Sequence, residues 1–232
     1  SGRSAAAHGA RFRRLRPAAR VLSMLKRTMD IVVAAVGLVI LCPLFVLIAI
    51  AVRLDSPGAI FYRAKRVARG GRRFKMLKFR SMVEHADELG PAVSVEHDPR
   101  ITRIGAVLRR TKLDELPQLI NVLVGDMSLV GPRPEAPEFV QQYSPEDMVV
   151  LSVRPGITDW ASIRGVDEGR VLALVENPQA EYQSSLLAAK LELQREYVRN
   201  RSFRMDLSIL LCTAVTLVRR CWTPHQSRSQ AG

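Results

Sequence analysis

The sequence predicts an α+β protein that is mostly helical: a small globule with a membrane helix near its N-terminus and amphipathic helices lying in the membrane interface. Three observations carry this prediction: an uncharged apolar stretch, two strand-like stretches around a Gly-Gly turn, and several segments of helical periodicity. The 232 residues suffice for one domain with a good core plus an extra segment. We expect a basic tail at residues 1–25, a membrane helix at 26–54, a globular domain at 55–222 and a disordered tail at 223–232.

The composition indicates negatively charged partners. The net charge is +13 and the sequence pI is near 10.6, which suits phospholipid headgroups, phosphorylated substrates or nucleic acid. Residues 3–29 contain eight Lys or Arg and no acid, so they form either a disordered basic tail or a segment lying on anionic lipid. The three cysteines form no CxxC pair and the four histidines are scattered, which argues against a disulfide framework and against a zinc site.

Residues 31–52 carry no charge and are long enough to span a membrane as a helix. Pro43 lies near the middle, where it removes a backbone hydrogen bond and kinks the helix. Basic residues crowd both flanks, and the positive-inside rule then places both ends in the cytoplasm. A re-entrant helix that bends at Cys42-Pro43 and leaves on the side where it entered satisfies both observations. A spanning helix is the alternative.

The next segments predict a basic hairpin. Residues 59–63 and 74–79 read as strands, and the Gly-Gly turn at 69–72 connects them. Residues 83–95 are polar and predict a short helix with a loop. Farther on, residues 179–200 have the periodicity of an amphipathic helix. Residues 206–218 predict an apolar helix flanked by arginines, which lies in the membrane interface or in the core.

The stretch ITRIGAVLRRTKLDELPQLINVLVGDMSLVGPRP at residues 101–134 holds the candidate site. Ile104, Val107 and Leu108 recur at helical spacing, and a second helix is expected to start at Asp114, with Pro117 in its first turn. The pair Asp114-Glu115 would then lie where free N–H groups and the helix dipole stabilise carboxylates and attract phosphate. Such a carboxylate could act as a nucleophile or a Mg²⁺ ligand, although an acidic pair at a helix start is also common without any function.

The run DPRITRIGAVLRRTKLDELPQLINVLVGDMSLVGPRPE at residues 98–135 resembles the signature of bacterial sugar transferases, the monotopic phosphoglycosyl transferases. KFRSM at 78–82 and the RPGIT-W pattern at 154–160 resemble two further motifs of that family, and the likeness covers residues 24–222. The resemblance implies transfer of a sugar-1-phosphate from a UDP-sugar to a polyprenyl (undecaprenyl) phosphate, with release of UMP. It would be the first membrane step of capsule, exopolysaccharide, O-antigen or glycoprotein glycan synthesis, on the cytoplasmic face of the bacterial inner membrane.

The resemblance also implies roles for residues. Asp114 would be the nucleophile that forms an aspartyl-phosphosugar intermediate, and Asp114 with Glu115 would hold Mg²⁺. The implied positive contacts to phosphate are Lys78, Arg80, Arg109, Arg133 and Arg154. The family has a re-entrant helix with Ser-Pro at its bend, where this chain has Cys42.

This chain departs from the third motif at Asp159, which takes the place of the usual glycine, and at residues 161–165, which take the place of Ala-Gln-Val-Asn-Gly. The sequence does not name the sugar. A nucleic-acid-binding protein and a catalytically silent membrane scaffold are the alternative functions. The apolar stretch and the few aromatic residues fit nucleic acid poorly, so we expect none as a partner. The apolar helices also allow a homodimer.

Overall fold

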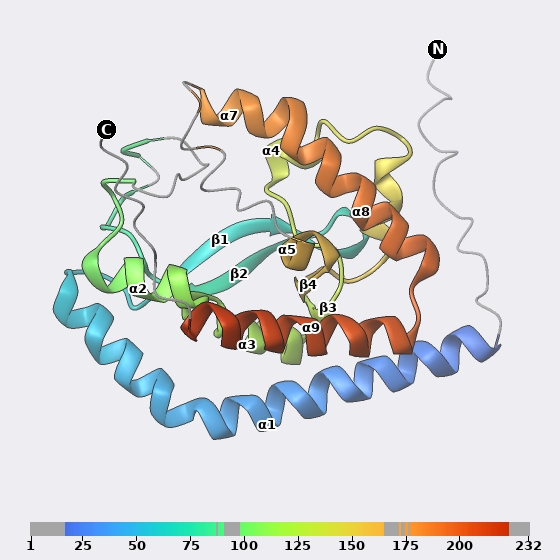
Figure 1. Ribbon diagram of the computed structural model, residues 1–232, viewed down its shortest axis with the longest axis horizontal. Helices are drawn as coiled ribbons and strands as arrows, with labels where there is room; N and C mark the ends of the chain where they lie inside the picture. The colour runs from blue at the N-terminus through green and yellow to red at the C-terminus, as the bar shows by residue number, and fades with distance from the viewer. Residues whose placement is uncertain are drawn as a thin grey trace, which may run out of the picture.

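The structure is a computed structural model that describes residues 17–86, 88–90, 98–164, 172, 175 and 177–222. It is mostly helical with short sheets, as the sequence predicted. Helix α1 (Pro17–Asp55) runs beneath the rest of the molecule, and α3 (Gln118–Val124) and α9 (Phe203–Trp222) lie between it and the other elements (Figure 1). The acidic pair and its surroundings are therefore built on top of the apolar helix.

Helix α1 begins at Pro17, so part of the predicted basic tail is helical, and residues 1–16 lie outside the described part. Pro43 lies inside the helix, and Figure 1 shows that α1 bends along its length. Residues 23–55 of α1 are long and apolar enough to cross a membrane: their most apolar stretch of 18 residues has a mean hydropathy of 3.1, and only 11% of that stretch is buried. Whether the helix re-enters or spans stays a prediction.

The hairpin consists of β1 (Phe61–Val67) and β2 (Arg73–Phe79), which pair antiparallel with Ala64 opposite Met76. The turn η1 (Arg69–Gly71) needs glycine, because Gly70 and Gly71 have φ angles of 73° and 80°. Strand β2 confirms the prediction, whereas β1 begins and ends later than residues 59–63. The basic residues in β1 hid its alternation, in which only Ala64 and Val67 are buried.

Helix α2 (Arg103–Thr111) confirms the predicted first helix and is capped by the Thr102 hydroxyl, which accepts from Gly105 N. The second helix does not start at Asp114. A 3₁₀ turn, η2 (Leu113–Glu115), follows instead, and α3 starts at Gln118. Pro117 has no N–H to continue an α-helical ladder, so Leu116 N donates to Leu113 O three residues back.

Strands β3 (Ser128–Val130) and β4 (Gly156–Thr158) pair in parallel and frame the Gly-Pro-Arg-Pro turn. Their backbones come so close that a Cβ on Gly156 would lie 2.1 Å from Gly131 N. Along the chain, α4 (Pro137–Val140) and η3 (Asp147–Ser152) come between β3 and β4, and α5 (Trp160–Arg164) follows β4. The close approach of Gly131 and Gly156 fixes the start of the turn that carries Arg133.

The C-terminal helices confirm the predicted pattern. Helix α7 (Pro178–Glu181), the π-helical turn η4 (Tyr182–Leu186) and α8 (Leu187–Asn200) form the predicted helix at 179–200. Helix α9 extends beyond the predicted 206–218; its Ile209 is fully buried in the core, while Leu211 and Val215 are exposed. The described part of 83–95 contains turns and no helix; its remainder and residues 223–232 lie outside the described residues.

Candidate active site

The acidic pair lies in the tight turn between α2 and α3. Lys112 ends α2 in the left-handed conformation, with a φ of 60°, and the chain then turns sharply through η2. This turn directs both carboxyls inward, where Asp114 is 5% exposed and Glu115 is 8% exposed. Burying two neighbouring carboxyls is costly unless cations and hydrogen bonds compensate them.

Glu115 has these partners. Lys78 Nζ of β2 donates to its Oε1 at 3.0 Å, and the Arg133 guanidinium donates to both of its oxygens, with 3.1 Å to Oε2. Burial alone would raise the pKa of Glu115, but Arg133 and Lys78 outweigh it and hold the pKa well below the usual 4.5. Glu115 is therefore an ionised carboxylate whose two oxygens are both in use.

Asp114 is different. Its Oδ2 lies 3.6 Å from Lys78 Nζ, and its buried Oδ1 has no hydrogen-bond partner among the described residues. Burial raises the pKa of Asp114 above 3.8, against the opposing charges of Lys78 and Lys112. Two adjacent carboxyls whose environments shift their pKa values in opposite directions are characteristic of functional sites.

The sequence also predicted Arg109 and Arg133 for this site, and Arg133 contacts Glu115 directly. Arg109 acts on the pair through its charge: it opposes the rise in the pKa of Asp114, and it adds to the lowering of the pKa of Asp98 that Arg100 mainly causes. Asp98 is buried and forms an ion pair of 2.6 Å with Arg100. Lys78 and Arg133 thus contact the pair from β2 and from the Gly-Pro-Arg-Pro turn, and the charge of Arg109 acts on it from α2.

Arg80 and Arg154 lie elsewhere. The Arg80 guanidinium donates to Ser56 O and Pro57 O, both at 2.6 Å, and so caps the C-terminal end of α1. Arg154 Nε donates to Gly125 O at 3.1 Å, at the far end of α3 from the pair. Burial, with Arg69 and Arg27 adding to it, lowers the pKa of Arg154. The contacts that the structure shows for these two arginines are with main-chain carbonyls and not with the acidic pair, so their expected role at phosphate stays a prediction.

Sequence reasoning missed several residues that build the site. Asn121 of α3 accepts from Leu77 N and donates to Lys75 O, both at 2.9 Å, and so fixes the strand that carries Lys78. Gln118 follows the pair by one turn and is fully buried, and neither of its amide atoms has a hydrogen-bond partner in the described chain. Lys112, next to the pair, had no assigned role. Only its position beside the acids could have indicated one.

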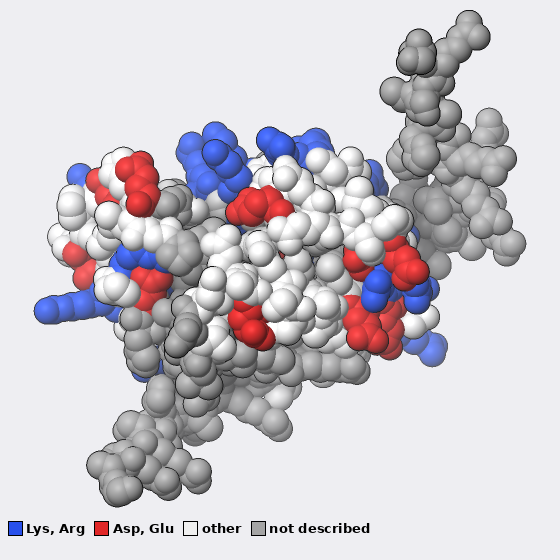
Figure 2. Space-filling model, turned by 90° about the horizontal axis from the view of Figure 1, so that it is seen from above, with Lys and Arg blue, Asp and Glu red and all other residues white. Residues whose placement is uncertain are grey.

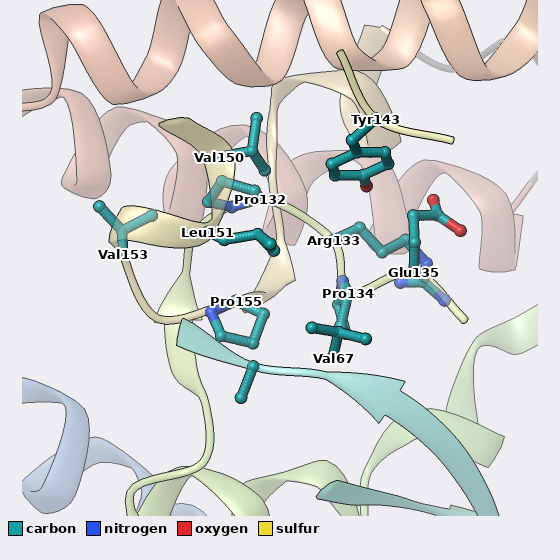
Figure 3. Close-up of a pocket in the computed structure, with 11 residues that line it drawn as sticks. Val67, Pro132, Arg133, Pro134, Glu135, Tyr143, Val150, Leu151, Val153 and Pro155 are labelled. Atoms are coloured by element: carbon teal, nitrogen blue, oxygen red, sulfur yellow. The ribbon is translucent and has the colours of Figure 1, made fainter. Parts of the chain in front are cut away.

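A small pocket lies beside Arg133 (Figure 3). It is lined by Val67 of β1, by the turn at 132–135, and by Tyr143 and Val150; its volume of about 10 Å³ is room for roughly one water molecule. Glu135 at its edge accepts from Lys190 Nζ at 2.7 Å and from the Tyr182 hydroxyl at 2.9 Å. This pocket is too small for a nucleotide. The hydrogen bonds of Glu135 beside it help to hold the turn that carries Arg133.

Exposed cations cover the outer face of the hairpin. Lys65 and Lys75 are direct cross-strand neighbours, and Arg63 and Arg73 are exposed on the same face. Figure 2, which views the molecule from above Figure 1, shows Lys and Arg gathered along one edge. Like charges placed opposite each other destabilise a hairpin unless an anion compensates them, which suits an anionic surface.

The acidic pair can supply only some of the ligands that Mg²⁺ needs. No group of three or more His, Cys, Asp or Glu with metal-binding geometry occurs among the described residues. Asp114 Oδ1 is an unused carboxylate oxygen, whereas both oxygens of Glu115 face cations. Because Mg²⁺ often binds one or two carboxylates together with substrate phosphates, the arrangement fits a metal held by Asp114 and substrate oxygens.

Fold and site together have two features: one long apolar helix, and above it a buried carboxyl pair whose Glu115 is bound by Lys78 and Arg133. The chain belongs to the bacterial sugar transferase family, whose sequence profile matches residues 21–220.

Characterised relatives cover most of the chain. It is 36% identical over 201 residues to the UDP-N-acetylgalactosamine-undecaprenyl-phosphate N-acetylgalactosaminephosphotransferase of Aeromonas hydrophila. It is 39% identical over 201 residues to the UDP-glucose:undecaprenyl-phosphate glucose-1-phosphate transferase of Escherichia coli K12. Each match covers 85% of this chain, which spans only 44% and 41% of those two relatives. The exopolysaccharide production protein ExoY of Rhizobium meliloti is 36% identical, with 82% of this chain and 84% of ExoY covered.

Proposed function

We propose that this protein transfers a sugar-1-phosphate from a UDP-sugar to undecaprenyl phosphate, with release of UMP, as the first membrane step of a surface polysaccharide or glycoprotein glycan. One observation carries the proposal: beside a fully engaged Glu115, Asp114 keeps an unpartnered, buried carboxylate oxygen. Two of the relatives act, by their names, on a UDP-sugar or its sugar-1-phosphate and on undecaprenyl phosphate.

In the first step Asp114 Oδ1 attacks the β-phosphorus of the UDP-sugar. An O–P bond forms to the carboxylate, the bond between the β-phosphorus and the bridging oxygen breaks, and UMP leaves with the electron pair. The attacking carboxyl must be ionised, and Lys78 and Lys112 oppose the effect of burial on its pKa. In the second step an oxygen of undecaprenyl phosphate attacks the same phosphorus and displaces the Asp114 carboxylate.

Lys78, Arg109 and Arg133 would bind the phosphate oxygens on which charge develops. Lys78 and Arg133 already share Glu115, so this carboxylate holds both cations in place before the substrate arrives. Glu115 thus acts as the organiser of the cations in this proposal. The roles first expected for Arg80 and Arg154 at phosphate have no support in their contacts.

Mg²⁺ is the proposed cofactor. Substrate oxygens and Asp114 Oδ2, the oxygen that does not attack, would hold it, with Glu115 available only once the substrate has drawn Lys78 and Arg133 away. When bound, the ion would neutralise the pyrophosphate and aid the departure of UMP.

The proposed location is the cytoplasmic face of the bacterial inner membrane, with α1 as a re-entrant, monotopic anchor. Pro43 within the bent helix and exposed apolar residues such as Val39 and Leu47 support this path. The exposed apolar side of α9 would rest in the interface, and the basic N-terminal segment and hairpin would contact anionic lipids.

The decisive experiment measures UMP release with Mg²⁺ and undecaprenyl phosphate across a panel of UDP-sugars. Release with one sugar, lost with EDTA and lost in Asp114→Asn, is the expected result, and mass spectrometry should find a phosphosugar adduct on Asp114. Silence of folded protein across the panel would favour the scaffold function. Normal turnover by Asp114→Asn would eliminate the nucleophile.

A further inference from the structure

A second buried carboxylate lies behind Arg133. Asp159 is 1% exposed and stands at the end of β4, where its Oδ2 accepts from Arg133 N at 3.1 Å. Its Oδ1 accepts from Ser162 N at 2.7 Å, which caps the first turn of α5. One oxygen suffices for a helix cap, so the contact to Arg133 is a separate use of the second oxygen.

Helix α8 reinforces this contact. Gln194 is 2% exposed, and its Nε2 donates to Asp159 Oδ2 at 3.2 Å and, more weakly, to Arg133 O at 3.4 Å. Asp159 and Gln194 together thus hold both the N–H and the carbonyl of Arg133. The main chain at this residue has little freedom to shift.

The same face of α8 also contacts the turn two residues after Arg133, at Glu135. Lys190 precedes Gln194 by four residues, so both side chains lie on one side of the helix. Lys190 binds Glu135, two residues after Arg133, and the close backbone contact of Gly131 with Gly156 holds the turn from the other side. The turn that carries Arg133 is therefore anchored before, at and after this residue.

We propose that Asp159, supported by Gln194, is a positioning residue: it fixes the Arg133 main chain so that the guanidinium meets Glu115 and the phosphates of the substrate. This inference rests on the proposed function. Because small misplacements of a phosphate-binding group are costly to catalysis, loosening this anchor should slow turnover even in folded protein.

Two variants remove the anchor in different ways. Asp159→Ser keeps a hydroxyl that can cap α5 but is too short to reach Arg133 N. Gln194→Met keeps the size of the side chain and removes its donor. The exposed Gln141 provides a matched control, Gln141→Met. Thermal unfolding and gel filtration give the folded fraction, so turnover is compared per folded molecule.

We expect Asp159→Ser to lower kcat about tenfold and Gln194→Met to lower it by a smaller factor, with Gln141→Met unchanged. In an Arg133→Lys background, which removes the guanidinium fork, Asp159→Ser should lower kcat by less than about twofold. A merely structural role would give the same loss in both backgrounds. If Asp159→Ser fails to fold, Gln194→Met in the two backgrounds decides.

The outcomes separate this inference from the proposed function. Wild-type protein that releases UMP, with kcat unaffected by Asp159→Ser and Gln194→Met or reduced equally in both backgrounds, overturns the inference alone. Wild-type protein without UMP release from any UDP-sugar overturns the proposed function and the inference with it.

Discussion

Helix α3 has charged side chains at both of its ends, buried at the N-terminal end and partly buried at the C-terminal end, and the two groups find different hydrogen-bond partners. At the N-terminal end, Glu115 is fully engaged, whereas Asp114 keeps an oxygen without a partner in the described residues. At the C-terminal end, Arg27 donates to Val122 O and Leu123 O at 2.7 and 3.0 Å, and Arg154 donates to Gly125 O. Fixed carbonyls of the helix end satisfy these cations.

The anchor of α1 extends the second group. Asp30 accepts from the Ser128 hydroxyl and from Leu129 N, and Asp206 accepts from Lys26 Nζ and the Tyr197 hydroxyl. These carboxylates are as buried as Asp114, yet each of their oxygens has a donor. The comparison teaches that burial of charge does not distinguish a site from an anchor. Among these buried carboxylates, what sets Asp114 apart is an oxygen without a hydrogen-bond donor in the described residues.

The largest expected effect comes from Asp114→Asn. UMP release should fall on the order of a thousandfold or more, because the nucleophile is lost. Its raised pKa means that the ionised form costs stability at neutral pH, so the neutral amide should leave the melting temperature unchanged or raise it. Both are measured on the same detergent-purified protein. A large drop in melting temperature would mean that Asp114 belongs with the anchors.

Asp206→Asn should have the reverse profile. It weakens a partly buried ion pair of 2.6 Å with Lys26 and a hydrogen bond from Tyr197, and we expect a loss of about 2 kcal/mol in the free energy of unfolding. Turnover per folded molecule should change little, because the side-chain contacts that the structure shows for Asp206 are with Lys26 and Tyr197 and not with the acidic pair. Chemical denaturation alongside UMP release checks both points. A selective loss of turnover would contradict the division between the two ends.

The pH dependence of stability tests Glu115. Its folded-state pKa lies below its unfolded value, so its stabilisation is fully present above pH 4.5 and is lost as pH falls through the folded pKa. The free energy of unfolding of the wild type should exceed that of Glu115→Gln by about 2 kcal/mol from pH 5 to 7, and this difference should shrink below about pH 4. Denaturation series at these pH values measure it. If the stability difference between the two proteins instead grew as the pH fell, the pKa of Glu115 would be raised in the folded protein and not lowered.

The smallest effect is expected at a surface pair near the anchored end. Arg72 and Asp126 form an ion pair in which the Arg72 side chain is 59% exposed. Asp126→Asn should therefore cost less than about 1 kcal/mol and leave turnover unchanged, and added salt should narrow the difference further. Its value gives the baseline against which Asp206→Asn is judged.

Much of this arrangement could be predicted from the sequence because it depends on local patterns. The apolar stretch, the Gly-Gly hairpin turn, α2 and the C-terminal helices follow from periodicity and turn chemistry. The acidic pair also stands out locally, although Pro117 moved the start of α3 beyond it.

The rest depends on contacts between distant segments. Arg80 and Arg154 look like phosphate ligands by residue type, but carbonyls from residues 56–57 and from Gly125 occupy them. Likewise, the sequence places Asp159 in a loop far from Arg133, and only the pairing of β3 with β4 brings the two together. No local pattern encodes such partners.

The attachment of α1 has a mechanical consequence. Lys26, Arg27 and Asp30, which lie just before the apolar stretch of α1, join this helix to β3 and to the end of α3, the helix that begins beside the acidic pair. Helix α1 continues from these residues into its apolar stretch without an intervening loop. The depth at which the helix settles in a bilayer would then set the height of Asp114 above the lipid phosphates. A protein built in this way reaches only substrates presented at that level, whatever the length of the lipid tail beneath.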